Sequence, residues 1–168
     1  MREQAELVQC AETLREMYDE FTQSVQDLGN KAKGRSTAGN KMGNSFLHWI
    51  GGSHIRTDRD RLCEEFLEKV QAQLELIRTA LEGADAEETA EVWNAVADVM
   101  LEPIPGRSNA TTDLMKRAMC SQFQPMLAFL TPEQLRGHYD RLKAAYRPRD
   151  LLPVEKELLR EMERRLSL

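Results

Sequence analysis

The sequence predicts an all-α fold: a single-domain bundle of five or six mostly antiparallel helices, with a long glycine-rich basic loop between the first two long helices. The first observation is composition. Of the 168 residues, 30 % are charged and only 6 % are aromatic, and straight-chain apolar residues lose little rotamer freedom in a helix. The second observation is spacing, because apolar residues recur every three or four positions, as on one helical face. A chain of this length forms about one domain.

The first helix is predicted over residues 2–28. Its apolar positions alternate four and three residues apart, which is a heptad pattern whose seam packs against other helices. We expect that partner to be another helix of the same bundle, and self-association through the seam is the alternative. The seam consists of Leu7, Ala11, Leu14, Tyr18, Phe21, Val25 and Leu28.

Two further helices follow the basic loop. The second begins near Thr57 or Asp58 and ends just before Gly83, which stops it. The third opens on Asp85, has acidic residues in its first turn, where they suit the helix dipole, and ends at Pro103. The residues predicted to face the core are Cys63, Phe66, Val70, Leu74, Ile77 and Leu81 on the second helix, and Val92, Trp93, Val96, Val99 and Met100 on the third.

The last part of the chain predicts three more helices. The fourth spans residues 112–130, and Pro125 inside it should kink or split it. Thr131 caps the fifth, with proline at the next position, and this helix reaches Tyr146. The sixth spans residues 150–166. The apolar residues on these helices are Leu114, Met115, Ala118, Met119, Phe123, Met126, Leu127 and Leu130, then Leu135, Tyr139 and Leu142, and finally Leu151, Leu152, Val154, Leu158, Leu159, Met162 and Leu166.

Residues 29–56 break this pattern and are predicted to form a flexible, glycine-rich basic insert within the single domain 1–168. The insert holds six of the nine glycines and no acidic residue. Its five cations give it a charge of +5, which leaves 18 basic and 28 acidic side chains, or −10, elsewhere in the chain. Loops of this length inside a compact bundle are usually either functional or disordered.

The insert begins with a partial match to a phosphate-binding loop. In GNKAKGRST, Gly29, Gly34 and Ser36 are in register with that pattern, but Arg35 stands where it requires lysine. The pattern also needs a buried strand before it and a helix after it, and neither is predicted. We therefore interpret the match as coincidence in a glycine-rich segment.

Two interpretations of the insert remain. It is either a solvated linker whose charge balances an acidic body, or a contact element for a polyanion such as RNA, DNA or an acidic protein face. Residues 45–55 carry a short apolar cluster, either a small helix that covers the bundle or an exposed aromatic anchor for a partner. The residues predicted to contact a partner or an anion are Lys31, Lys33, Arg35, Lys41, Phe46 and Trp49.

Residue spacing predicts no catalytic, cofactor or metal site. No two of the three histidines lie four residues apart, and the chain has neither a Glu-x-x-His nor a Gly-x-Ser-x-Gly pattern. Cys10, Cys63 and Cys120 are too widely spaced for a zinc knuckle and too few for a disulfide framework. We interpret them as small buried apolar residues of a protein in a reducing compartment.

The predicted function is that of a non-enzymatic interaction or adaptor protein, which binds a protein partner through its helical surface and residues 29–56. The alternative is a nucleic-acid-associated regulator that uses the same cations, helped by a second basic cluster of Arg136, Arg141, Lys143, Arg147 and Arg149. An enzyme assembled from dispersed residues ranks last. With neither a secretory signal nor a membrane span in the sequence, we expect a soluble, cytoplasmic protein without membrane contact.

Overall fold

A computed structural model describes the backbone of residues 4–38, 44–103, 110–146, 151 and 153–168, and the side chains of these residues except 4–8, 31–38, 44–57 and 110. The described residues form six α-helices and one 3₁₀ helix, without a strand. The predicted all-α bundle is therefore confirmed.

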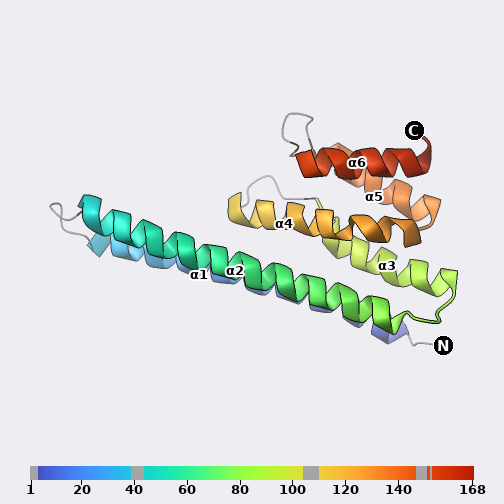
Figure 1. The fold of residues 1–168 in the computed structure, drawn as a ribbon, viewed down its shortest axis with the longest axis horizontal. Helices are drawn as coiled ribbons and strands as arrows, with labels where there is room; N and C mark the ends of the chain where they lie inside the picture. The colour runs from blue at the N-terminus through green and yellow to red at the C-terminus, as the bar shows by residue number, and fades with distance from the viewer. Residues whose placement is uncertain (1–3, 39–43, 104–109, 147–150, 152) are drawn as a thin grey trace.

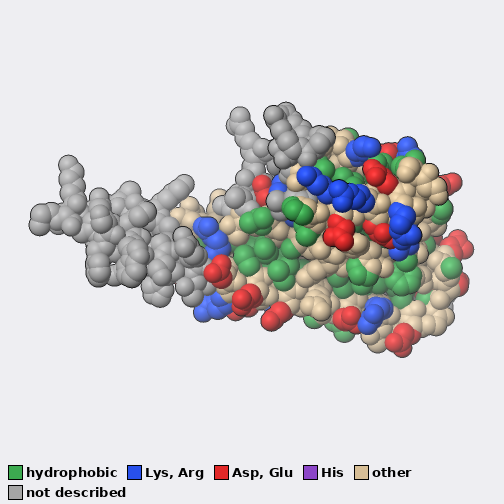
Figure 2. Space-filling view, turned by 45° about the horizontal axis from the view of Figure 1, so that its top comes forward, with side chains coloured by type: hydrophobic (Ala, Val, Ile, Leu, Met, Phe, Trp, Pro, Cys, Tyr) green, Lys and Arg blue, Asp and Glu red, His purple; other side chains and the backbone are tan. Residues whose placement is uncertain are grey.

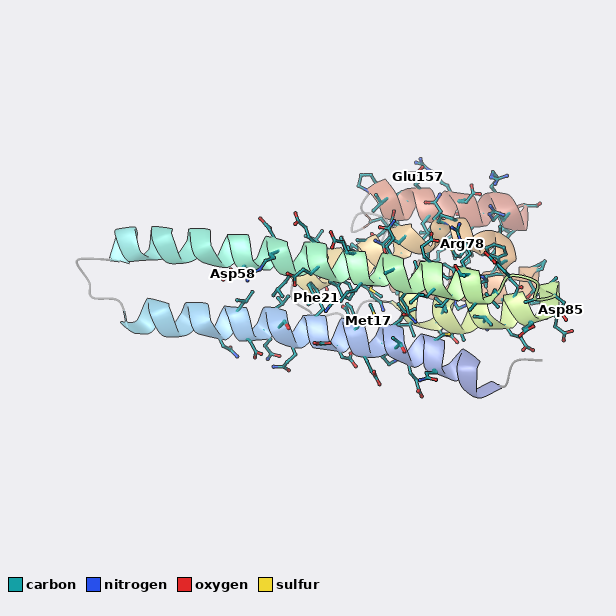
Figure 3. The ribbon with its side chains drawn as sticks, turned by 60° about the horizontal axis from the view of Figure 1, so that its bottom comes forward. Met17, Phe21, Asp58, Arg78, Asp85 and Glu157 are labelled. Atoms are coloured by element: carbon teal, nitrogen blue, oxygen red, sulfur yellow. The ribbon has the colours of Figure 1, made fainter. Side chains whose placement is uncertain are left out.

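The two longest helices, α1 (Gln4–Ala38) and α2 (Asn44–Ala80), form an antiparallel hairpin (Figure 1). Phe21 lies on the side of α1 that faces α2 (Figure 3), and its ring stacks on that of Phe66 with centroids 4.5 Å apart. Leu14 and Val25 of the predicted seam are also fully buried. The seam therefore packs within the chain, and self-association through it stays a prediction.

The hairpin helices are longer than the sequence predicts. α1 continues past Leu28 to Ala38, and α2 begins at Asn44 rather than near Thr57. Residues 29–56 do connect the first two long helices, but their backbone is helical on both sides of residues 39–43. Extending an existing helix fixes one residue for each hydrogen bond gained, and an interior glycine costs only about 1 kcal/mol. Two helices that already pack together can therefore continue through a glycine-rich sequence.

The other helices gather against one part of the hairpin and form the body of the molecule (Figure 1). They are α3 (Ala86–Met100), α4 (Ala110–Phe123), the 3₁₀ helix η1 (Gln124–Phe129), α5 (Pro132–Ala145) and α6 (Pro153–Leu166). α3 packs against α1, α4 lies between α2 and α6, and α5 packs against α6. Trp93 on α3 is buried between Phe123 and Phe129, with ring centroids 6.2 and 5.8 Å away.

The predicted helix ends are confirmed where local chemistry sets them. The Asp85 carboxylate accepts a hydrogen bond from the Glu88 backbone N–H at 2.8 Å. Thr131 begins α5 with a capping box, exchanging hydrogen bonds of 3.2 and 3.0 Å with Gln134. Gly83 adopts a φ of +82°, a left-handed conformation that suits glycine. Pro125 splits the predicted fourth helix, because α4 ends at Phe123 and η1 follows.

Two inward positions were predicted wrongly. Leu114 and Val154 are 51 % and 42 % exposed. In both helices a charged residue takes a core position instead, Lys116 in α4 and Glu155 in α6, each 3 % exposed. Apolar spacing alone therefore misplaced the buried face at the start of these helices.

Candidate interaction surface

The hairpin brings most of the predicted contact residues to one end of the molecule. Lys31, Lys33 and Arg35 lie in the last turns of α1, and Phe46 and Trp49 lie in the first turns of α2. The backbone places both groups at the end of the hairpin that extends past α3–α6 (Figure 1). The side chains of these five residues, and the whole of Lys41, lie outside the described part of the chain.

The apolar cluster in residues 45–55 belongs to α2 itself. The alternative of a separate small helix covering the bundle is therefore wrong for the backbone of this segment, because a continuous helix cannot fold back over α3–α6. The cluster lies at the same end of the hairpin as the α1 cations. Its interpretation as an aromatic anchor for a partner therefore stays a prediction.

The described cations of the second predicted basic cluster each have a partner of their own. Arg136 pairs with Asp140 at 3.1 Å, and Arg141 pairs with Asp98 on α3 at 3.0 Å. Lys143 donates to the Tyr139 hydroxyl at 2.9 Å, and this hydrogen bond raises the pKa of the lysine. Arg147 and Arg149 lie outside the described residues. The described members of the cluster therefore do not form one cationic patch.

Lys116 is a buried cation that the sequence analysis missed. Its Nζ donates to the Val99 carbonyl at 2.5 Å, lies 3.8 Å from Glu102 and sits 4.8 Å above the ring of Tyr18. Burial lowers the pKa of this lysine. The last carbonyls of a helix lack intrahelical donors and carry its negative partial charge, so Lys116 caps the end of α3.

Cys120 performs the same task one turn further along α4. Its thiol donates to the Met100 carbonyl at 3.3 Å, and burial raises the pKa of the thiol to about 12. Lys116 and Cys120 lie four residues apart and hence on one face, which was the available sequence signal. Cys10 and Cys63 are only half-buried against the core, so the prediction of buried cysteines holds fully for Cys120 alone.

His138 joins α5 to α3 through a small polar network. Its Nδ1 lies 2.7 Å from an Arg141 nitrogen and its Nε2 lies 2.8 Å from the Asn94 side-chain oxygen. A guanidinium only donates, so Nδ1 accepts and Nε2 carries the proton that is donated to Asn94. Burial and then the positive charge of Arg141 lower the pKa of His138, against a smaller opposite effect of Asp98. His138 is thus a neutral histidine that is 3 % exposed and fully hydrogen-bonded.

This network predicts that stability falls in mild acid. The folded pKa of His138 is lowered from the ordinary value of 6.5, so its contribution is complete above pH 6.5. It is lost as the pH falls from there toward the folded pKa, because the unfolded chain takes up the proton first. Urea titrations at successive pH values should show the free energy of unfolding decreasing below that point, with a slope of at most about 1.4 kcal/mol per pH unit for one proton.

The control is His138→Gln, which can still donate to Asn94 and accept from Arg141 but cannot titrate. Its free energy of unfolding should depend less steeply on pH in the same window. An equal slope in both proteins would assign the acid sensitivity to other groups.

The described residues were also searched for a metal site and a membrane span, and the chain was compared with known proteins. Within the part of the chain whose side chains are placed, no three His, Cys, Asp or Glu residues lie where they could hold a metal ion. None of the described helices combines the length and apolar character needed to cross a membrane. The sequence matches no protein-family model, and comparisons with curated proteins and with solved structures found no match.

Proposed function

We propose that this protein is a non-enzymatic helical interaction protein, which binds a protein partner through its helical surface and the far end of the α1–α2 hairpin. This proposal rests on the concentration of positive charge in one segment of the extended α1–α2 hairpin. The hairpin continues past the α3–α6 body (Figure 1). Residues 29–56, which include the last turns of α1 and the first turns of α2, carry +5, while all other residues together carry −10.

The composition of that segment suits a protein contact. Arginine and aromatic residues, tryptophan above all, contribute most to the binding energy of protein interfaces. Arg35 and Trp49 belong to different helices of the hairpin. Because the two helices are antiparallel, both residues lie at the same end of the hairpin. A surface that combines cations with aromatic rings fits a partner with an acidic face.

The described core supports a binding role in another way. Its buried ionisable groups connect helices: Lys116 caps α3, His138 joins α5 to α3, and Glu155 pairs with Arg117 across α4 and α6 at 3.1 Å. These groups are engaged in holding the bundle together. A binding role for the described residues therefore falls to their exposed side chains.

The proposal can be tested by photo-cross-linking in cells that produce the protein. A photoreactive amino acid replaces Trp49, and the adducts are identified as protein or nucleic acid by mass spectrometry. We expect a protein adduct whose yield falls about tenfold or more when Lys31, Lys33, Arg35 and Lys41 become alanine, since each exposed ion pair contributes up to ~1 kcal/mol.

Two controls make the result specific. A second variant loses four cations outside residues 29–56, namely Arg61, Arg78, Arg136 and Arg164, and should keep the adduct. The photoreactive residue placed at Leu76, which is 64 % exposed on α2, should not capture the same protein. A nucleic-acid adduct at position 49 would favour the alternative function, and identical adducts at positions 49 and 76 would contradict a specific contact at the hairpin end.

A further inference from the structure

A surface cleft lies between α5 and α6, apart from the hairpin end. Its volume is about 350 Å³ and it is open to solvent. Its lining includes Lys143, Tyr146, Leu151, Lys156, Leu159 and Arg160. Figure 2 brings the top of the view in Figure 1, where α6 lies, toward the reader and shows Lys and Arg side chains beside hydrophobic ones, with Asp and Glu side chains among them. The volume lies at the lower end of the range for ligand sites, about 300–1,000 Å³.

One acidic residue at the cleft is already engaged. The Tyr139 hydroxyl donates to a Glu163 oxygen at 2.7 Å. Lys143 donates to the same hydroxyl, and its Nζ lies 4.0 Å from Glu163. Glu163 and Lys143 therefore balance each other's charge across the α5–α6 contact.

Two cations remain at the cleft. Lys156 and Arg160 both line it and lie one turn apart on α6, a spacing that puts them on the same side of a helix. Neither forms an ion pair with a carboxylate among the described residues, whereas the neighbouring cations Arg164 and Arg165 both pair with Glu161. The cleft thus offers a net positive charge that the described part of the protein does not neutralise.

The same cleft has an apolar part. Leu151, Leu159 and Tyr146 line it and are each half-buried. An occupant that matches both parts carries negative charge for Lys156 and Arg160, together with an aliphatic group for the two leucines. A phosphodiester backbone supplies the charge but no aliphatic group, whereas an acidic peptide segment with leucine supplies both.

We propose that the α5–α6 cleft binds an acidic, leucine-containing segment of a protein partner. This inference rests on the proposed function and adds the chemistry of the partner. The open shape favours a segment of a larger molecule, because isolated small ligands are usually buried over most of their surface. The cleft belongs to the body, whereas the α1–α2 end lies beyond it (Figure 1), so one acidic partner can engage two separate points and gain affinity from both.

The test measures fluorescence anisotropy of a labelled peptide of alternating Glu and Leu with the full-length protein. The Lys156→Glu/Arg160→Glu variant should bind the peptide about tenfold or more weakly, because reversing two contact charges turns attraction into repulsion. Arg61→Glu/Arg78→Glu is the charge-matched control on α2 and should bind within about twofold of the unchanged protein, as expected for exposed charges that do not line the cleft. Circular dichroism establishes that both variants stay folded.

Two further probes identify what the cleft recognises. A peptide with serine in place of leucine should bind about fivefold or more weakly, since the apolar contact is lost. A single-stranded RNA of equal charge should not compete with the Glu-Leu peptide. Equal binding of both peptides, effective competition by RNA, or unchanged binding to the Lys156→Glu/Arg160→Glu variant would each overturn the proposal for the cleft.

The variant with alanine at Lys31, Lys33, Arg35 and Lys41 separates this inference from the proposed function. If the cleft binds the Glu-Leu peptide, that variant retains at least part of the binding. If the cleft proposal fails, photo-cross-linking at position 49 still tests the hairpin end on its own.

Discussion

Replacing Trp93 with alanine is expected to lower the free energy of unfolding by about 3–5 kcal/mol, the range typical of a fully buried aromatic side chain. Trp93 is 1 % exposed and contacts the rings of Phe123 and Phe129. Its side chain joins α3 to the end of α4 and to η1, so its removal leaves a cavity where three elements meet. Urea denaturation followed by circular dichroism measures the loss.

The matched control removes an exposed apolar side chain. Leu76→Ala, at a position that is 64 % exposed, should change the free energy of unfolding by less than about 0.5 kcal/mol. A loss below about 1 kcal/mol for Trp93→Ala would contradict the described core, because a fully enclosed ring cannot be deleted at so low a cost.

Glu155→Ala should lower the free energy of unfolding nearly as much, by about 3 kcal/mol. This is a large effect for a charged residue on a helix rich in charged residues. The Glu155 carboxylate lies 3.1 Å from the Arg117 guanidinium, and the two side chains are only 4 % and 19 % exposed. Alanine at this position takes from the largely buried Arg117 its partner at 3.1 Å and leaves it the charge of Asp113 on its own helix. Thermal and urea unfolding should both report the loss.

The double variant Arg117→Met/Glu155→Leu distinguishes a broken ion pair from poor packing. Replacing a buried pair by apolar residues of similar volume is often close to neutral, so the double variant should recover most of the stability. If it unfolds as easily as Glu155→Ala, the loss does not arise from breaking the Arg117–Glu155 ion pair.

The parts of the fold that the sequence predicted are those fixed by nearby residues. Asp85 and Thr131 cap helices through residues three positions away, and Pro125 interrupts a helix by its own geometry. Such features need no knowledge of the rest of the chain. The buried face of α3, with Trp93 and Val96 at helical spacing, was correct for the same reason.

The parts that could not be predicted depend on residues distant in sequence. In the sequence, Lys116 and Glu155 look like surface residues. Only the fold brings the Val99 carbonyl to Lys116 and the Arg117 side chain to Glu155. Charge counting predicted a second basic cluster, but Asp98, 43 residues before Arg141, neutralises part of it. The extent of the hairpin was missed because glycine-rich sequence argues against a helix unless a second helix packs beside it.

The same limit applies to the candidate site. The sequence singled out the cations of residues 29–56 by their contrast with an acidic chain, and the structure brings the helices carrying Lys31 and Trp49 to one end. The sequence did not single out Lys156 and Arg160, because they look like solvated residues of a charged helix. The cleft beside them, lined by residues of both α5 and α6, distinguishes them from their neighbours Arg164 and Arg165, which pair with Glu161.

The hairpin also gives the molecule an electrical polarity. Residues 29–56 carry +5 and the remainder −10, and the helical parts of this segment, 29–38 and 44–56, lie toward one extremity of the long axis (Figure 1). The chain therefore has a permanent dipole along its length, which a charged neighbour can rotate before the two molecules touch. Because the Debye length is only about 8 Å at physiological ionic strength, this orienting effect acts only when the surfaces of the two molecules are separated by roughly that distance.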